Sequence, residues 1–205
     1  MPRELDAVEI RVLGCLLEKE QTTPEYYPLT LNALVAACNQ TSNRDPVMAL
    51  EAADVQGALD RLHAEMLAWP REGGRARRWE HALDRRLGLD PKGKALLGAL
   101  FLRGAQTVGE LRARTERVVA WTSLGEVEGA LRALATGEER LVVEVSRRPG
   151  QKEGRWVHTA GGPPVAEAAE PPAAEPLGER IARLEDRVSE LSAKLAALLE
   201  RFGET

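Results

Sequence analysis

The stretch DVQGALDRLH, Asp54 to His63, recurs later in the chain as EVEGALRALA, Glu126 to Ala135. Each copy places apolar residues at positions i, i+3, i+4 and i+7, which is the spacing of one face of an α-helix. The two stretches therefore predict matching amphipathic helices and an internal repeat. The apolar positions are Val55, Ala58, Leu59 and Leu62 in the first copy and Val127, Ala130, Leu131 and Leu134 in the second.

The two copies also match on either side of these helices. Upstream, TLNALVAACNQ (Thr30 to Gln40) corresponds to TVGELRARTER (Thr107 to Arg117), and each opens with a threonine that can cap a helix. Further upstream, LGCLLE and LGALFL align Gly14 with Gly98. Downstream, each copy has an apolar strand, a polar turn with glycine, and a strand ending in Trp-x-His.

The order helix, helix, helix, strand, turn, strand is typical of a winged helix. We therefore predict a mainly α protein with small β-hairpin wings (α+β), built from two tandem winged-helix (helix-turn-helix) domains over residues 1–88 and 89–160. Glycine inside a helix costs up to about 1 kcal/mol relative to alanine. Its recurrence at Gly14 and Gly98, and at Gly57 and Gly129, indicates either close helix crossings or residues retained after duplication.

The segment after the second unit changes composition. Residues 161–176, GGPPVAEAAEPPAAEP, are typical of a flexible linker. Over 177–203 apolar residues recur every 3.5 residues on average, which predicts a coiled-coil helix. Ile181 and Val188 at a positions with leucine at every d position favour a parallel homodimer, and the alternative is a helix folded back onto its own domains. The predicted dimerisation residues are Leu177, Ile181, Leu184, Val188, Leu191, Leu195, Leu198 and Phe202.

Composition limits the classes of protein to which the chain can belong. The 205-residue chain has a formal net charge of −4, and its amino end is charged where a signal peptide needs an apolar run. Its longest uncharged apolar stretch, ALLGALFL, is too short to span a bilayer. We therefore expect a cytoplasmic, soluble protein without a membrane partner. Cys15 and Cys38 lie among apolar residues, which suits reduced thiols in a core.

Three segments carry a family resemblance. They are LLEKEQTTPEYYPLTLNALVAACNQTSNRDPVM (Leu16 to Met48), LRGAQTVGELR (Leu102 to Arg112) and the terminal heptads. Together they closely resemble the YceH-like family of uncharacterised bacterial proteins, over essentially the whole chain. The resemblance implies tandem winged-helix domains and brings no established activity, substrate or catalytic residue.

Motifs of enzyme chemistry do not occur in the sequence. The histidines His63, His81 and His158 and the two cysteines show no metal-ligand spacing, and no nucleophile elbow or phosphate-binding glycine loop is present. We therefore expect no enzymatic activity, no catalytic residues, no cofactor, no metal and no small-molecule substrate.

Basic residues gather on the predicted wings and on the helix at 107–117. Residues 91–160 hold 12 Lys and Arg against 8 Asp and Glu, whereas both flanking segments are acidic. Arginines on a wing can lie along a phosphate backbone and release counterions. The candidate DNA-binding residues are Arg71, Arg75, Arg77, Arg78, Arg112, Arg114, Arg117, Arg147, Arg148, Lys152 and Arg155.

The third helix of each unit argues against base reading. Asp54, Asp60, Glu126 and Glu128 lie on these helices, and although helix capping explains part of this acidity, an Arg, Asn or Gln array for base edges is missing. Two functions stay open: a dimeric protein that contacts duplex DNA, and a protein-interaction scaffold that does not bind DNA.

The polar loop between the second and third helices of the first unit is also a candidate. Its residues Asn43 and Arg44 could contact a groove or a partner protein, or could only complete the turn that joins the two helices.

Overall fold

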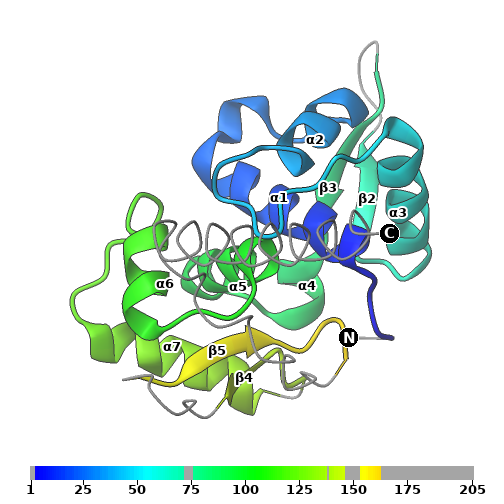
Figure 1. Cartoon of the computed structure of the whole chain (residues 1–205). Helices are drawn as coiled ribbons and strands as arrows, with labels where there is room; N and C mark the ends of the chain where they lie inside the picture. The colour runs from blue at the N-terminus through cyan, green and yellow to red at the C-terminus, as the bar shows by residue number, and fades with distance from the viewer. Residues whose placement is uncertain (1–2, 72–75, 138, 146–152, 163–205) are drawn as a thin grey trace, which may run out of the picture. The chain divides into compact units, whose positions relative to one another are not determined.

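Both copies of the predicted repeat fold into the same succession of elements in the computed structural model (Figure 1). The structure describes residues 3–71, 76–137, 139–145 and 153–162. By its contacts the chain divides into two compact units, Met1–Pro164 and Val165–Thr205. The predicted heptad helix, and the predicted linker beyond residue 162, lie outside the described residues.

The first repeat contains three helices and a small sheet. Its helices are α1 (Ala7–Thr22), α2 (Leu31–Cys38) and α3 (Ala52–Ala64), with a 3-10 turn η1 (Pro24–Tyr26) after α1. The antiparallel sheet has the order β1-β3-β2, and Trp79 lies opposite Leu29 on one side and Pro70 on the other. The strands are β1 (Leu29–Thr30), β2 (Ala68–Arg71) and β3 (Arg78–His81).

The second repeat follows a short helix, α4 (Leu83–Leu87). Its helices are α5 (Pro91–Arg103), α6 (Val108–Thr115) and α7 (Leu124–Thr136), and its antiparallel strands are β4 (Val142–Val145) and β5 (Arg155–His158). Gln106 pairs with Trp156 through two backbone hydrogen bonds of 2.9 and 2.7 Å, where Leu29 pairs with Trp79 in the first repeat. The predicted repeat and its α+β class, with small antiparallel sheets, are confirmed.

Polar side chains fix where the helices begin. Thr30 Oγ1 accepts a hydrogen bond from the Ala33 amide at 3.3 Å, and Thr107 Oγ1 accepts one from Glu110 at 3.2 Å, so both predicted threonine caps are confirmed. Asp6 and Asp90 cap α1 and α5 in the same way. These caps set the helix starts locally, which is why the two repeats have matching boundaries.

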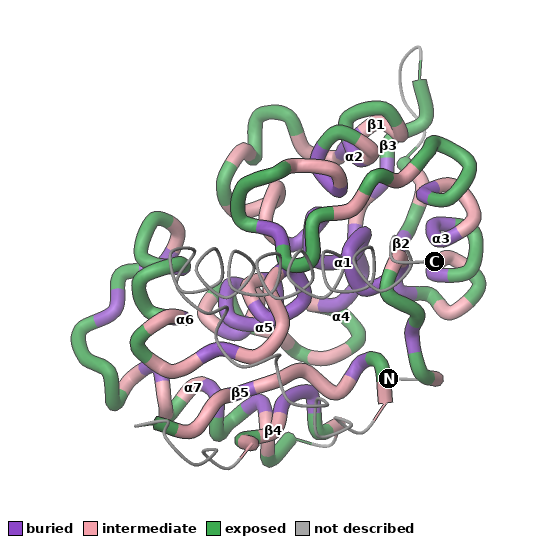
Figure 2. Tube along the Cα trace, viewed as in Figure 1, coloured by how far each residue is buried: buried purple, intermediate pink, exposed green. Residues whose placement is uncertain are grey.

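The apolar faces of α1 and α5 pack along each other and form much of the core, which Figure 2 shows as buried segments inside exposed loops. A Cβ atom on Gly14 would lie 2.9 Å from Leu102 Cδ2, and one on Gly98 would lie 3.3 Å from Leu17 Cβ. A Cβ atom on Gly129 would meet nothing within 4 Å. Close crossing therefore explains Gly14 and Gly98, but not Gly129 on the exposed side of α7.

No helix among the described residues is both long enough and apolar enough to cross a lipid bilayer. Cys15 and Cys38 are free and buried, as the sequence predicts.

The contrast between these glycines gives a paired prediction. Gly14→Ala should destabilise the protein by roughly 1–3 kcal/mol, because the added methyl group overpacks the crossing against Leu102 and Phe101. Gly129→Ala should instead stabilise it by up to about 1 kcal/mol, because α7 gains helix propensity without a clash. Urea unfolding of both variants measures the two signs, and a stabilising Gly14→Ala would contradict the close crossing.

Candidate nucleic-acid interface

The first hairpin presents three described arginines to solvent. Arg71 Nε donates to the Glu80 carboxylate at 2.8 Å, so its charge is largely offset. Arg78 Nη1 donates to the Pro28 carbonyl at 2.9 Å, which fixes the side chain without neutralising it. Arg77 is exposed and has no polar partner among the described residues. Arg75 lies outside the described residues. Among the described residues of this hairpin, Arg77 and Arg78 are thus the charges available to a phosphate.

The second repeat places its described basic candidates in different surroundings. Arg155 Nη1 donates to the Ala105 carbonyl at 2.8 Å and to the Glu110 carboxylate at 3.3 Å, so it is partly committed. Arg112 and Arg117 are exposed and lack a described partner. The predicted helix ends earlier than expected, at Thr115, so Arg117 follows α6. Arg147, Arg148 and Lys152 lie outside the described residues.

Arg114 on α6 differs from Arg112 and Arg117 because its side chain has a described hydrogen-bond partner. Its guanidinium donates to Gln106 Oε1, the side chain of the residue that pairs with Trp156. Its pKa is lowered, first by burial and then by the positive charge of Arg103. The positive charge of Arg103 therefore acts on Arg114 near the end of α6.

The third helices carry no free cation among their described residues. Arg61, on α3, donates to Asp6 and Glu9, and Arg132, on α7, pairs with Glu128 one turn earlier. The exposed positions of α3 include Asp54 and Asp60. A major-groove reader needs donors and acceptors free to meet base edges, and these helices do not provide them.

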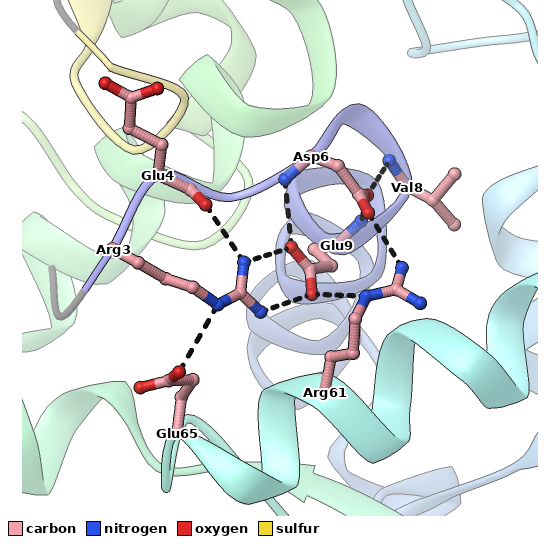
Figure 3. A network of polar contacts seen from close by, with 7 residues as sticks. All are labelled: Arg3, Glu4, Asp6, Val8, Glu9, Arg61 and Glu65. Carbon is pink, nitrogen blue, oxygen red and sulfur yellow. Dashed lines mark hydrogen bonds and ion pairs between the residues drawn. The ribbon is translucent and has the colours of Figure 1, made fainter.

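Arg61 is held by an ion network at the start of α1 (Figure 3). Glu9 has a fully buried carboxylate that receives two hydrogen bonds from Arg3, at 2.9 and 2.6 Å, and one from Arg61 at 2.9 Å. Burial raises the pKa of Glu9, but the hydrogen bonds from Arg3 and the Asp6 amide outweigh it and lower the pKa overall. The network clamps α3 onto the beginning of α1.

The loop after α2 is organised by a buried arginine. The side chain of Arg44 has no exposed surface, and it donates to both Glu18 carboxylate oxygens at 3.1 and 2.7 Å. Its Nε also donates to the Ala37 carbonyl at 3.0 Å. Arg44 is therefore not a surface contact, and of the two interpretations of this loop the structural one accounts for it. Asn43 is exposed with φ of 58°, and its Oδ1 accepts from Arg103 at 2.8 Å.

A second buried arginine, Arg11, was not predicted from the sequence. Arg11 is 1% exposed and donates to the Cys38 carbonyl at 3.0 Å and to the Pro46 carbonyl at 2.6 Å. Burial lowers its pKa. Its signal in the sequence is a charge among Ile10, Val12 and Leu13, where the surrounding helix is apolar.

The two Trp-x-His histidines occupy unlike surroundings. His81 Nε2 lies 3.0 Å from the Glu20 carboxylate, to which Lys94 Nζ also donates at 2.6 Å. The pKa of Glu20 is lowered to about 2, first by the hydrogen bond with His81 and against the effect of burial. His158 packs edge-on against Phe101, and burial lowers its pKa to about 4.

Within the described residues, no group of three or more His, Cys, Asp or Glu side chains could hold a metal ion.

Burial of His158 predicts a specific pH dependence of stability. Its folded-state pKa of about 4 lies below the ordinary value of 6.5, so the unfolded chain binds the proton more readily in between. Stability should be complete above pH 6.5 and should fall as the pH drops towards 4, by about 2 kcal/mol at pH 5. Urea unfolding at pH 7.5 and 5.0 should show this loss in the natural chain, and His158→Gln should remove most of it. An equal loss in the variant would show that other groups control the slope.

Comparison with known proteins identifies the family. Residues 5–151 match the family described as "Protein of unknown function, DUF480". A UPF0502 protein of Geobacter metallireducens is 52% identical over 197 residues, covering 92% of this chain and 90% of that protein. UPF0502 proteins of Pelobacter propionicus and Chromobacterium violaceum are 47% and 45% identical, covering 95% and 98% of this chain and 93% of each relative.

These matches confirm the predicted membership in an uncharacterised bacterial family, and no activity is attached to the names of these relatives. The chain therefore belongs to the DUF480 family, and the relatives named above are UPF0502 proteins.

Proposed function

We propose that the chain is a non-enzymatic tandem winged-helix protein that contacts duplex DNA through phosphate groups and dimerises through its C-terminal heptads. One observation carries the proposal. In each repeat the residue two positions before the second helix pairs with the second strand of the hairpin, as Leu29 with Trp79 and as Gln106 with Trp156. Three helices with a hairpin returned onto them in this way are typical of winged-helix modules.

The distribution of free charge supports phosphate contacts rather than base contacts. Arg77 at the first hairpin, and Arg112 and Arg117 around the end of α6, are exposed without described partners. The arginines of the third helices are instead committed to carboxylates. Such a surface binds DNA with little sequence preference and with an affinity that falls steeply as salt rises.

Removal of the free wing charges tests this function. Arg77→Ala combined with Arg78→Ala should weaken binding of the full chain to a random-sequence duplex and reduce the log-log salt slope by roughly one for each lost phosphate contact. Arg85→Ala combined with Arg132→Ala removes the same charge from α4 and α7 and should leave the slope unchanged. Fluorescence anisotropy between about 50 and 200 mM salt gives both values. Absence of binding at the lowest salt would overturn the proposal.

The heptad segment gives a separate prediction about assembly. Leu191→Asp places a charge at a d position of the proposed coiled coil and should convert a dimer into a monomer. Ala193→Asp places the same charge at the solvated f position and should preserve the dimer. Sedimentation velocity measures the mass of the natural chain and of both variants. A monomeric mass for all three would favour a helix that folds back within one chain, and a dimeric mass for Leu191→Asp would contradict pairing through the heptads.

The outer face of α7 favours a second candidate function, a protein-interaction scaffold. Gly125, Gly129 and Ala133 are exposed at four-residue spacing, and Leu124 beside them is 49% exposed. A stripe without bulky side chains lets a partner helix approach closely, but it offers nothing to a base edge.

The substitution Gly129→Arg distinguishes the two candidate functions. It should block binding of a partner helix to α7, and it should leave DNA binding by the wings intact.

A further inference from the structure

A pocket of about 310 Å³ lies where the end of α1, the length of α5 and the end of α6 meet. Its apolar wall is formed by Ala95, Ala99, Leu102 and Val118. The volume is at the lower end of the range of about 300–1,000 Å³ that small-molecule sites occupy. The pocket draws its lining from both repeats, so it exists only when the two are packed together.

Three arginines line this pocket: Arg103 from α5, Arg114 from α6 and Arg117 just after it. Arg103 donates one hydrogen bond to Asn43, but its Nε is buried without a hydrogen-bond partner among the described residues. Arg114 has one described acceptor, Gln106 Oε1, and Arg117 has none. Each guanidinium carries five N–H donors, so most of this donor capacity is unused.

Most of the other charges that line the pocket are already neutralised. Glu18 receives both hydrogen bonds from the buried Arg44, and Lys94 is held by Glu20 at 2.6 Å. Glu116 is the remaining carboxylate in the lining. Three guanidinium groups against one uncommitted carboxylate leave the pocket with a net positive charge.

We propose that this pocket binds a small organic anion, with an apolar body against the α5 wall and a carboxylate or phosphate group among Arg103, Arg114 and Arg117. Guanidinium groups form charge-assisted, often bidentate hydrogen bonds with both kinds of anion. Arg103 and Arg114 line the same pocket, and the positive charge of Arg103 lowers the pKa of Arg114 after the effect of burial, so an anion between them would also relieve their repulsion. This ligand site does not include the proposed DNA contacts at the first hairpin, and it shares only Arg117 with the charges proposed to contact DNA around α6.

The test uses the full ¹⁵N-labelled chain and three small probes of similar size. Phenyl phosphate and 3-phenylpropionate supply the two anions, and 3-phenylpropan-1-ol supplies the same kind of body without charge. A ligand of this size should bind with a dissociation constant of about 10 mM or below. At least one of the two anions should cause saturable chemical-shift changes at the amides of Gly98, Leu102 and Thr115. The alcohol should bind at least several-fold more weakly.

Variants locate the anion within the pocket. Arg103→Gln and Arg117→Gln should each weaken anion binding by roughly tenfold, as the loss of one charge-assisted hydrogen bond predicts. Arg112→Gln removes the same charge from α6 at a position outside the pocket lining and should leave the affinity unchanged. Because Arg117 is exposed and makes no described contact, its substitution should preserve the fold even if Arg103→Gln does not.

The outcomes are distinct. Equal binding of the alcohol would reduce the site to an apolar crevice and overturn the proposal, as would equal weakening by Arg112→Gln, which would indicate general charge attraction. The absence of saturable shifts with either anion would also overturn it. The relative affinities of phenyl phosphate and 3-phenylpropionate identify which anionic group the arginines prefer. Failure of the chain to bind a DNA duplex would leave this result unaffected.

Discussion

The close approach of α1 and α5 at Gly14 and Gly98 is the constraint on which the arrangement of the two repeats depends. A side chain at Gly14 would collide with Leu102 and Phe101, so the helices can cross at this distance only without one. Bonds between the repeats reinforce the crossing at its edges. The Asp45 amide donates to the Leu102 carbonyl at 2.8 Å, and Lys94 donates to Glu20 at 2.6 Å. The repeats therefore share one continuous core, and their outer surfaces are held in a fixed relation.

The same framework is completed by different chemistry in each repeat. In the first, the guanidinium groups of Arg11 and Arg44 donate to backbone carbonyls and hold the loop between α2 and α3. In the second, Trp121 Nε1 donates to Thr115 Oγ1 at 2.8 Å, and the Lys92 ammonium lies 5.5 Å from the centre of the Trp121 ring. Burial of an arginine is expensive unless its donors are satisfied, and of these donors Arg11 Nε is buried without a hydrogen-bond partner among the described residues. The first loop is therefore fixed in one conformation by specific hydrogen bonds, whereas packing of an aromatic ring fixes the second.

Local sequence patterns predicted the parts of the fold that local chemistry determines. Apolar spacing and threonine caps located α2, α3, α6 and α7, because these signals act within a few residues. The pairing of Gln106 with Trp156 was not predictable, because an isolated bridge has no periodicity of its own. Nor could spacing distinguish Gly14 from Gly129, since both lie in helical patterns and only the packing of α5 onto α1 separates them.

The candidate site was predicted less completely, because the availability of a charge depends on its partners in the folded chain. The type and position of Arg155 suggested a free wing residue, but Glu110 lies within 3.3 Å of it. Arg44 appeared to be part of a polar surface loop, yet its carboxylate partner, Glu18, comes from a different helix. The pocket near Arg103 had no sequence signal, because its wall forms only where α1, α5 and α6 meet.

The helix α6 is where the two proposed anion contacts meet, and helix geometry explains why one element can serve both. Successive residues of an α-helix are rotated by about 100°, so Arg112 and Arg114 point about 160° apart. Arg114 accordingly turns towards Gln106 and the pocket, while Arg112 projects into solvent. Since α3 and α7 have committed their arginines to ion pairs, the candidate DNA contacts that keep a free positive charge among the described residues lie on the first hairpin and around α6. An anion bound in the pocket would neutralise Arg114 and Arg117 and would leave Arg112 available for a phosphate backbone.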